Sequence, residues 1–160
     1  MRIEFIDQHR EHIVTLAAWH HEQWGHLYDD WTLDAARTEI ETHAHQRSLP
    51  TTLIAVEGGV ALGSVSLVLE DAPELCEHGS PWLANLYVIP EARGQGIGTQ
   101  LVRAAVELAA HSGVTQLFLF TPEHAGFYRR LGWRQIARTA LKGTAVDLME
   151  FSPLAIVAAA

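Results

Sequence analysis

The residues best suited to chemistry form one short stretch, Arg93-Gly94-Gln95-Gly96-Ile97-Gly98-Thr99. An apolar run at residues 83–89 precedes it with the length and β-branched content of a strand, and Pro90 ends that strand because proline cannot donate to a ladder. Apolar residues then recur at helical spacing over 101–109. The first N–H groups of a helix lack partners, and glycines carry no side chain that would keep a ligand away. The stretch therefore predicts an anion site suited to phosphates, with a ligand-free turn as the alternative.

The spacing of this stretch separates it from two familiar phosphate loops. It reads Gly-x-Gly-x-Gly rather than the dinucleotide pattern Gly-x-Gly-x-x-Gly, and no Gly-Lys-Ser/Thr follows. Arg93, Gly96 and Gly98 instead form Arg-x-x-Gly-x-Gly, which resembles the GNAT superfamily of acetyl-CoA-dependent N-acetyltransferases. In that family the loop wraps the pyrophosphate of coenzyme A. The resemblance implies acetyl-CoA as the cofactor, held by the backbone from Arg93 to Thr99.

A second motif, Tyr128 to Gly132-Trp133, resembles the family pattern Tyr-x-x-x-Gly-Phe, with tryptophan in the last place. The resemblance covers about residues 51–151. It implies that Tyr128 protonates the departing sulfur, and a phenol with an ordinary pKa near 10 is protonated at neutral pH. Packing of Tyr128 beside Phe127 is the alternative. The implied fold is α/β (α+β): the GNAT fold, with a central mixed, mostly antiparallel sheet that splays at the acetyl-CoA site and is flanked by about four helices.

The resemblance also assigns contacts near the thioester. Unpaired N–H groups around Leu86, Tyr87 and Val88 would hold the cofactor and polarise its carbonyl. Thr121 stands where the family often has asparagine and His124 where a small residue is usual, and both are expected beside the cofactor. These two positions resemble the actin N-terminal acetyltransferase branch.

The strand before the loop lacks a catalytic base. Some family members carry a carboxylate where this chain has Ala84 and Asn85, so the base must come from elsewhere. We expect the acceptor site to be lined by aromatic, amide and acidic side chains: Trp24, Tyr28, Trp31, Glu70, Asp71 and Asn85. Core packing for the aromatics and a solvated surface for the acids are the alternatives.

Periodicity predicts the elements that carry these residues. Strands are expected at about 1–6, 51–57, 60–70, 83–89, 115–121, 133–137 and 145–151, and helices at about 9–24, 32–47, 97–110 and after Pro122. Thr32 is the expected cap of the second helix, and Gly58-Gly59 predicts a hairpin turn. Gly63 indicates a bulge.

Composition predicts one domain over residues 1–160, with the cofactor-binding core at about 51–151. The formal net charge of −8 argues against nucleic acid and anionic membranes as partners. Residues 1–80 carry −10 and residues 81–160 carry +2, which favours a cationic acceptor on the N-terminal side, or reflects only a solvated surface. We expect a cytoplasmic protein without a metal site, since adjacent histidines such as His20 and His21 do not share a helix face. A homodimer is left open.

These observations predict an acetyl-CoA-dependent N-acetyltransferase. The acetyl group would move to a primary amine by direct attack in a ternary complex, with a small cationic amine as acceptor. A peptide N-terminus or a lysine side chain is the alternative acceptor. A non-catalytic acyl-CoA-binding sensor would need the Arg93 loop but not Tyr128, so the presence of both favours the enzyme.

Overall fold

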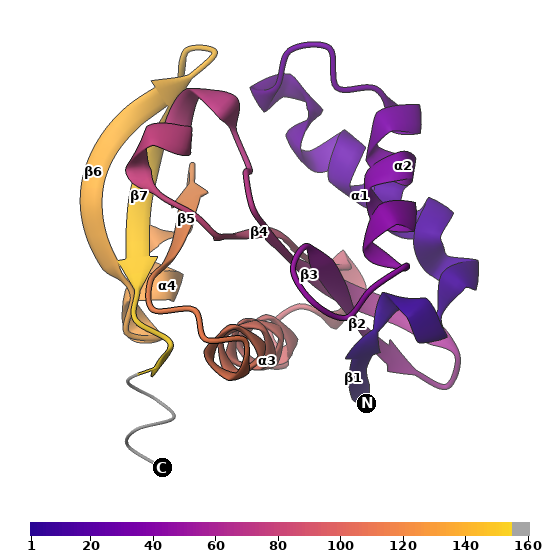
Figure 1. Cartoon of the computed structure of the whole chain (residues 1–160). Coiled ribbons are helices and arrows are strands. Elements are labelled where there is room, and N and C mark those ends of the chain that lie inside the picture. Colours follow the sequence, from indigo (N-terminus) through magenta and orange to yellow (C-terminus); the bar gives the residue numbers. More distant parts are fainter. Residues whose placement is uncertain (155–160) are drawn as a thin grey trace.

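The computed structural model describes residues 1–154 as one seven-stranded sheet with helices on both faces (Figure 1). The strands are β1 (Arg2–Phe5), β2 (Thr51–Glu57), β3 (Val60–Val68), β4 (Trp82–Val88), β5 (Leu117–Thr121), β6 (Arg134–Leu141) and β7 (Thr144–Phe151). The helices are α1 (Ile13–Trp24), α2 (Leu33–His43), α3 (Ile97–His111) and α4 (Ala125–Arg130). The sheet order is β1-β2-β3-β4-β5-β7-β6, and only β4 and β5 are parallel. The predicted mixed, mostly antiparallel sheet is confirmed; residues 155–160 of the predicted domain lie outside the described residues.

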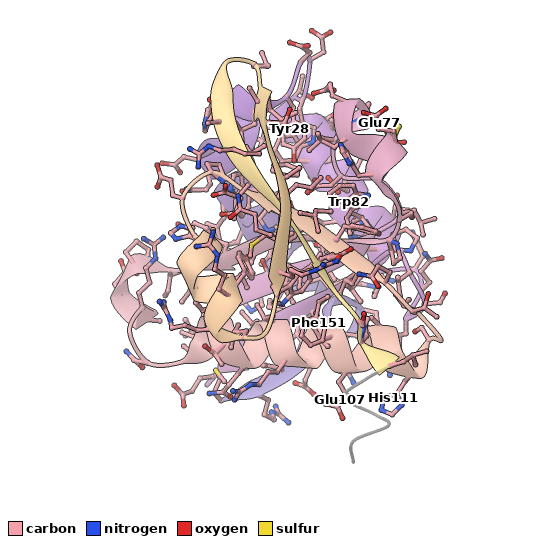
Figure 2. All side chains as sticks on the ribbon, turned by 90° about the vertical axis from the view of Figure 1, so that its left-hand side faces the viewer. Tyr28, Glu77, Trp82, Glu107, His111 and Phe151 are labelled. Carbon is pink, nitrogen blue, oxygen red and sulfur yellow. The ribbon has the colours of Figure 1, made fainter. Side chains whose placement is uncertain are left out.

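The parallel pair β4 and β5 is also the place where the sheet opens. The two strands share the single register pair Trp82 and Phe118, whereas β5 pairs with β7 along its whole length. Trp82 is fully buried, and in the rotated view it lies between Tyr28 and Phe151 (Figure 2). Beyond this pair β4 and β5 diverge, as the family resemblance predicted (Figure 1).

Two hydrophobic clusters attach the helices to opposite faces of the sheet. Leu53 and Val65 face α3 in one cluster, and Ile54 and Val56 face α1 and α2 in the other. This division follows from the period-2 alternation of β-strand side chains. The two sides of β2 and β3 therefore carry different chemistry, and the α1–α2 side also buries hydroxyl and imidazole groups.

Two irregularities shape the centre of the sheet. The pairing of β2 with β3 shifts between Ala55 and Val56, opposite Gly63, which confirms the predicted bulge. A Cβ at Gly63 would lie 2.5 Å from the Tyr87 carbonyl oxygen, so a close backbone approach requires glycine there. A second shift, in the pairing of β3 with β4, coincides with Asn85, whose φ is +56°. Asn85 therefore points differently from a regular strand residue.

The ends of several elements differ from the prediction. Thr32 caps α2 as expected, because its Oγ1 accepts the Ala35 N–H at 3.0 Å, but the helix ends at His43 rather than near residue 47. β3 ends at Val68 instead of residue 70, and β6 continues to Leu141. β6 lies at the sheet edge, and most of its residues are exposed. Its length therefore depends on pairing with β7, and its sequence has little of the apolar alternation that predicts a strand.

No helix within residues 1–154 combines the length and apolar character needed to cross a membrane. The same residues contain no group of three or more His, Cys, Asp or Glu side chains placed to hold a metal ion.

Candidate active site

The glycine loop from Arg93 to Thr99 connects the end of β4 to α3. Gly94 and Gly96 have φ of +78° and +81°, the left-handed region that favours glycine, and Gly96 is the N-cap of α3 without a side-chain cap. Within residues 1–154, no backbone or side-chain acceptor takes the N–H groups of residues 94–99. A Cβ at Gly94 or Gly96 would meet nothing within 4 Å. Exposed donors and open space at a helix N-terminus fit the phosphates of coenzyme A.

Arg93 links this loop to the open strand edge. Its Nε donates a 2.8 Å hydrogen bond to the Val88 carbonyl, and the guanidinium carbon lies 5.5 Å from the centre of the Tyr87 ring. The side chain is exposed, so the charge lies beside both the loop and the end of β4.

The last residues of β4, Leu86, Tyr87 and Val88, are half-buried. Tyr87 and Val88 pair with β3, while their other edge faces the gap left by β5. The backbone groups on that edge are therefore free of strand partners among the described residues, as the proposed contact with a thioester requires.

Tyr128 lies on α4 with its ring buried against Phe127 and Trp133, whose ring centres are 5.0 and 5.9 Å away. Its hydroxyl makes no hydrogen bond within residues 1–154. The one fully enclosed side-chain polar atom without a partner there is Trp133 Nε1, so the Tyr128 hydroxyl is not completely enclosed. Burial, and then the negative charge of Asp71, raise the pKa of Tyr128 above its ordinary value. The phenol is protonated at neutral pH, as the role of an acid requires, and its ring packs beside Phe127, as the alternative expects.

Thr121 is the last residue of β5, and His124 is the N-cap of α4. Thr121 is buried, and its Oγ1 accepts the His124 N–H at 3.0 Å, while the His124 side chain is exposed. This contact shapes the turn that leads into α4.

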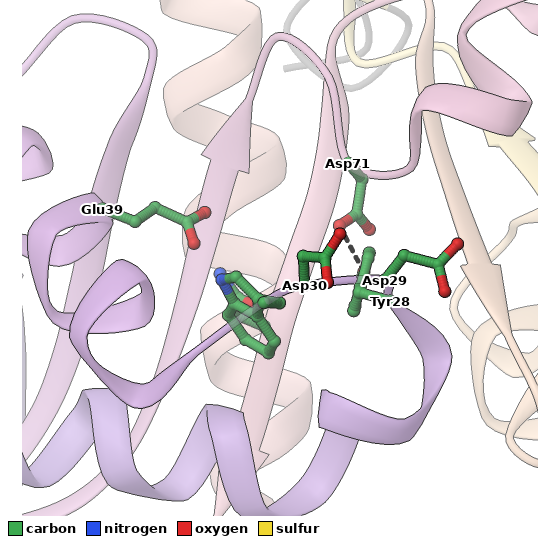
Figure 3. Close-up of a pocket in the computed structure, with 7 residues that line it drawn as sticks. Tyr28, Asp29, Asp30, Glu39 and Asp71 are labelled. Carbon is green, nitrogen blue, oxygen red and sulfur yellow. Dashed lines mark hydrogen bonds between the residues drawn. The ribbon is translucent and has the colours of Figure 1, made fainter.

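An acidic pocket of about 180 Å³ opens on the α1–α2 side of the sheet (Figure 3). It is lined by Tyr28, Asp29, Asp30, Trp31, Glu39, Asp71 and Asn85. These residues come from the α1–α2 connection, α2, the segment after β3, and the β4 bulge. Four are carboxylates and none is Lys or Arg. Lys142, from the β6–β7 turn, pairs with Asp29 at 3.0 Å, whereas the other three carboxylates form no ion pair within the described residues.

Asp71 is the most perturbed carboxyl group of this pocket. The Tyr28 hydroxyl donates a 2.8 Å hydrogen bond to its Oδ1 (Figure 3). Burial raises the pKa of Asp71 to about 7; the Tyr28 hydrogen bond opposes the rise and the charge of Glu39 adds to it. Burial also raises the pKa of Glu39.

The structure brings four of the six expected acceptor residues together: Tyr28, Trp31, Asp71 and Asn85. The other two lie outside the pocket. The Trp24 ring packs against Tyr87, 6.3 Å between ring centres, and Glu70 is exposed.

The sequence analysis did not predict three of the pocket carboxylates, Asp29, Asp30 and Glu39. Glu39 was detectable, since it follows the buried Ala36 by three residues and therefore shares its helix face. Asp29 and Asp30 lie in an irregular connection, where no periodicity indicates direction.

The comparisons with known proteins agree with this geometry. Residues 13–133 match the model of the Acetyltransferase (GNAT) family. The chain therefore belongs to this family, whose enzymes take the acetyl group from acetyl-CoA.

Among curated proteins, an aminoglycoside N(6')-acetyltransferase type 1 of Klebsiella aerogenes is 42% identical over 94 residues, covering 56% of this chain and 62% of that protein. The match thus spans about three fifths of that relative's length. A thialysine N-epsilon-acetyltransferase of Mus musculus is 31% identical over 62 residues, or 36% of each chain. Among solved structures, an aminoglycoside 6'-N-acetyltransferase complexed with coenzyme A has a TM-score of 0.72 at 16% identity, over 96% of this chain and 97% of that one. At such identity the structural likeness supports the fold alone.

Proposed function

We propose that this protein transfers the acetyl group of acetyl-CoA to a primary amine on a polycationic acceptor of the aminoglycoside type. The observation that carries the proposal is the pocket of four carboxylates next to the open edge of β4. A cation with several amines would replace the missing counterions of Asp30, Glu39 and Asp71. The similarity to an aminoglycoside N(6')-acetyltransferase supports the same acceptor class.

The Arg93–Thr99 loop is the proposed site of the coenzyme A pyrophosphate. Uncapped N–H groups and the N-terminus of α3 favour anions there, and Arg93 adds a positive charge. The pantetheine arm would lie along the β4 edge at Leu86, Tyr87 and Val88, whose backbone donors would polarise the thioester carbonyl.

Asp71 and Tyr128 are the proposed groups for proton transfer. An acceptor amine becomes a nucleophile only after it loses its proton, and Asp71 in the pocket would accept that proton as general base. The amine nitrogen then bonds to the thioester carbon as the carbon–sulfur bond breaks, and the nitrogen releases its second proton to solvent. Tyr128 would donate its hydroxyl proton to the departing sulfur, and solvent would carry the proton from Asp71 back to the phenolate.

A screen of acceptors tests the proposal directly. The protein is incubated with acetyl-CoA and, separately, kanamycin A, spermidine, free lysine, or a peptide with a free N-terminus, and products are identified by mass spectrometry. We expect acetylation of the polycationic acceptors, with kanamycin A ahead of the peptide. Acetylation of the peptide alone would contradict the assigned acceptor class, and acetylation of none would contradict the enzyme.

A further inference from the structure

A row of buried hydrogen bonds runs from α2 through the sheet to the acidic pocket. Asn85 Nδ2 donates to Ser66 Oγ at 3.2 Å, Ser66 Oγ lies 2.8 Å from Thr52 Oγ1, and Thr52 Oγ1 lies 2.8 Å from His43 Nδ1. Thr52 and Ser66 are fully buried and His43 is 3% exposed. The catalytic steps proposed above use none of His43, Thr52 and Ser66.

The hydrogen bonds of this row can all run from Asn85 to His43. The Ser66 hydroxyl accepts from the Asn85 amide nitrogen, so its own hydrogen can go to Thr52. Burial lowers the pKa of His43 to about 4, so the ring is neutral at neutral pH and carries one N–H. In the tautomer with that hydrogen on Nε2, Nδ1 accepts from Thr52 and the imidazole ends the row as an acceptor.

Glu39 lines the same pocket as this amide, and the Asn85 side chain lowers the pKa of Glu39 against the effect of burial. With its nitrogen donating to Ser66, the amide has its carbonyl oxygen left over as an acceptor. Asn85 also lines the acidic pocket from the β4 bulge, where its φ of +56° fixes the start of the side chain.

We propose that the row His43–Thr52–Ser66 holds the Asn85 carbonyl oxygen toward the acceptor, making Asn85 a specificity-determining residue and the three buried groups its positioning residues. The inference rests on the proposed function, because it assigns this oxygen to a hydrogen-bond donor of the amine acceptor. A rotated amide would present N–H groups to an ammonium instead, so the orientation decides between attraction and repulsion.

Thr52→Val tests the row because it removes one hydroxyl and nearly keeps the shape. The Ser66 hydroxyl then loses its acceptor and can donate to Asn85, which permits the amide to rotate. We expect the Kd of kanamycin A, measured by calorimetry, and its KM to rise roughly tenfold, as for a weakened hydrogen bond to a charged group. The kcat and the KM for acetyl-CoA should stay unchanged, and Thr52→Ser should restore wild-type values.

Two comparisons separate this role from a general loss of stability. Thr51→Val is the matched control, since Thr51 is an equally buried threonine on β2 whose hydroxyl bonds only backbone carbonyls, those of Gln46 at 2.9 Å and His43 at 3.4 Å, and no side chain of the row. Its acceptor Kd should equal that of the wild type. In an Asn85→Gly background, which tolerates the positive φ, Thr52→Val should have no further effect on acceptor binding.

The outcomes distinguish the inference from the function on which it rests. A tenfold effect of Thr52→Val that persists in the Asn85→Gly background would overturn the inference, as would equal effects of Thr51→Val and Thr52→Val. If the wild type binds kanamycin A but acetylates no amine, the proposed function fails and the binding series still decides the role of the row. If neither kanamycin A nor spermidine binds, both are wrong.

Discussion

In the proposed mechanism, Asp71 takes the proton of the acceptor amine and Tyr128 supplies the proton of the departing thiol. They come from different halves of the sheet, Asp71 from the segment after β3 and Tyr128 from α4 after β5. Tyr28 orients the Asp71 carboxylate through a 2.8 Å hydrogen bond, and the pKa of Asp71, about 7, is close to the value that suits a base at neutral pH.

The first prediction concerns this base. In the wild type, kcat/KM for the acceptor should rise as pH increases through about 7, because Asp71 accepts a proton only when ionised. Asp71→Asn should lower kcat by roughly 100-fold and remove that inflection. Rates measured from pH 5.5 to 9 decide it, and an unchanged inflection in the variant would assign the titration to another group.

The same shift predicts a gain in stability when activity is lost. The folded-state pKa of Asp71 lies above its unfolded value, so the folded state binds the proton more strongly and loses stability as pH rises from about 4 to about 7. Asp71→Asn should therefore raise the Tm more at pH 8 than at pH 5. Calorimetric scans at both values provide the measurement, and an equal change at both would contradict the linkage.

The next prediction concerns the acid. Tyr128→Phe keeps the packing against Phe127 and Trp133 but removes the hydroxyl, which has no hydrogen-bond partner among residues 1–154. It should lower kcat about 100-fold while coenzyme A affinity stays nearly the same, because a general acid acts in the transition state. Steady-state kinetics and coenzyme A titration separate the two effects; full turnover by the variant would make Tyr128 a packing residue.

The sequence alone identifies the candidate site residues that belong to a spacing motif. It does not identify all of those that only the tertiary structure brings together. The loop from Arg93 and the tyrosine at 128 follow patterns, and Asp71 followed from its position near the central strand. The row from His43 to Asn85 joins three strands and a helix, and pairing register alone decides that Thr52 and Ser66 meet. No linear pattern carries that information.

At the scale of elements, the β4–loop–α3 unit concentrates the anion-binding features. Its backbone donors come from the first turn of a 15-residue helix, whose dipole is well developed. The chain bends into this helix through Gly94 and Gly96, both with positive φ.

This unit gives a prediction about the cofactor. A Cβ at Gly98 would lie 3.6 Å from Phe127 Cζ, an ordinary contact, so Gly98→Ala should fold. The added methyl should hinder the backbone approach to the pyrophosphate and weaken coenzyme A binding about tenfold. Gly25→Ala, with a comparable 3.5 Å contact to His21 at the end of α1, is the control and should bind normally. Calorimetric titration with coenzyme A measures both variants. Equal affinities of Gly98→Ala and the wild type would mean that the pyrophosphate does not bind at this loop.

The packing of α1 and α2 on the sheet gives a prediction about acid. Burial lowers the pKa of His20 to about 3 and that of His43 to about 4, so both rings are neutral in the folded protein. Below pH 6.5 the unfolded chain binds protons that the folded chain excludes, and stability falls as pH drops toward 4, by at most about 1.4 kcal/mol per pH unit for each ring. Urea unfolding at pH 7 and 5 should show a smaller loss in His20→Gln than in the wild type. An identical loss would mean that His20 does not titrate in this range.

Across the whole molecule, charge follows the two halves of the chain. Residues 1–80 carry a net −10 and supply every pocket carboxylate, while residues 81–160 carry +2 and supply the Arg93–Thr99 loop proposed to bind the pyrophosphate. The two proposed substrates of opposite charge would thus approach surfaces of matching sign.

This separation predicts a salt effect on one substrate. The kcat/KM for a cationic acceptor should fall as salt rises from 0.1 to 1 M, where the Debye length shrinks from about 10 to about 3 Å. Measurements with saturating acetyl-CoA isolate the acceptor. Asp30→Asn should reduce the salt dependence, whereas Glu57→Gln, on the distant β2 end, should not; equal slopes would mean that the pocket charge does not steer the acceptor.

The number and order of the helices and strands were easier to predict than the residues at which they end. Seven strands and four helices follow from periodicity and turn residues, yet the ends of α2, β3 and β6 differ by several residues. Whether a helix or strand continues by one more residue depends there on a single hydrogen bond and on partial burial. Local composition does not predict either of these.

The single register pair of Trp82 and Phe118 has a mechanical consequence. Within the described residues the backbone pairing of the sheet passes from one half to the other only at this pair, with the proposed base beyond one half and the proposed acid beyond the other. An acyl donor lodged between β4 and β5 would set the angle between these halves, which favours a kinetic order in which the donor binds first and the amine second.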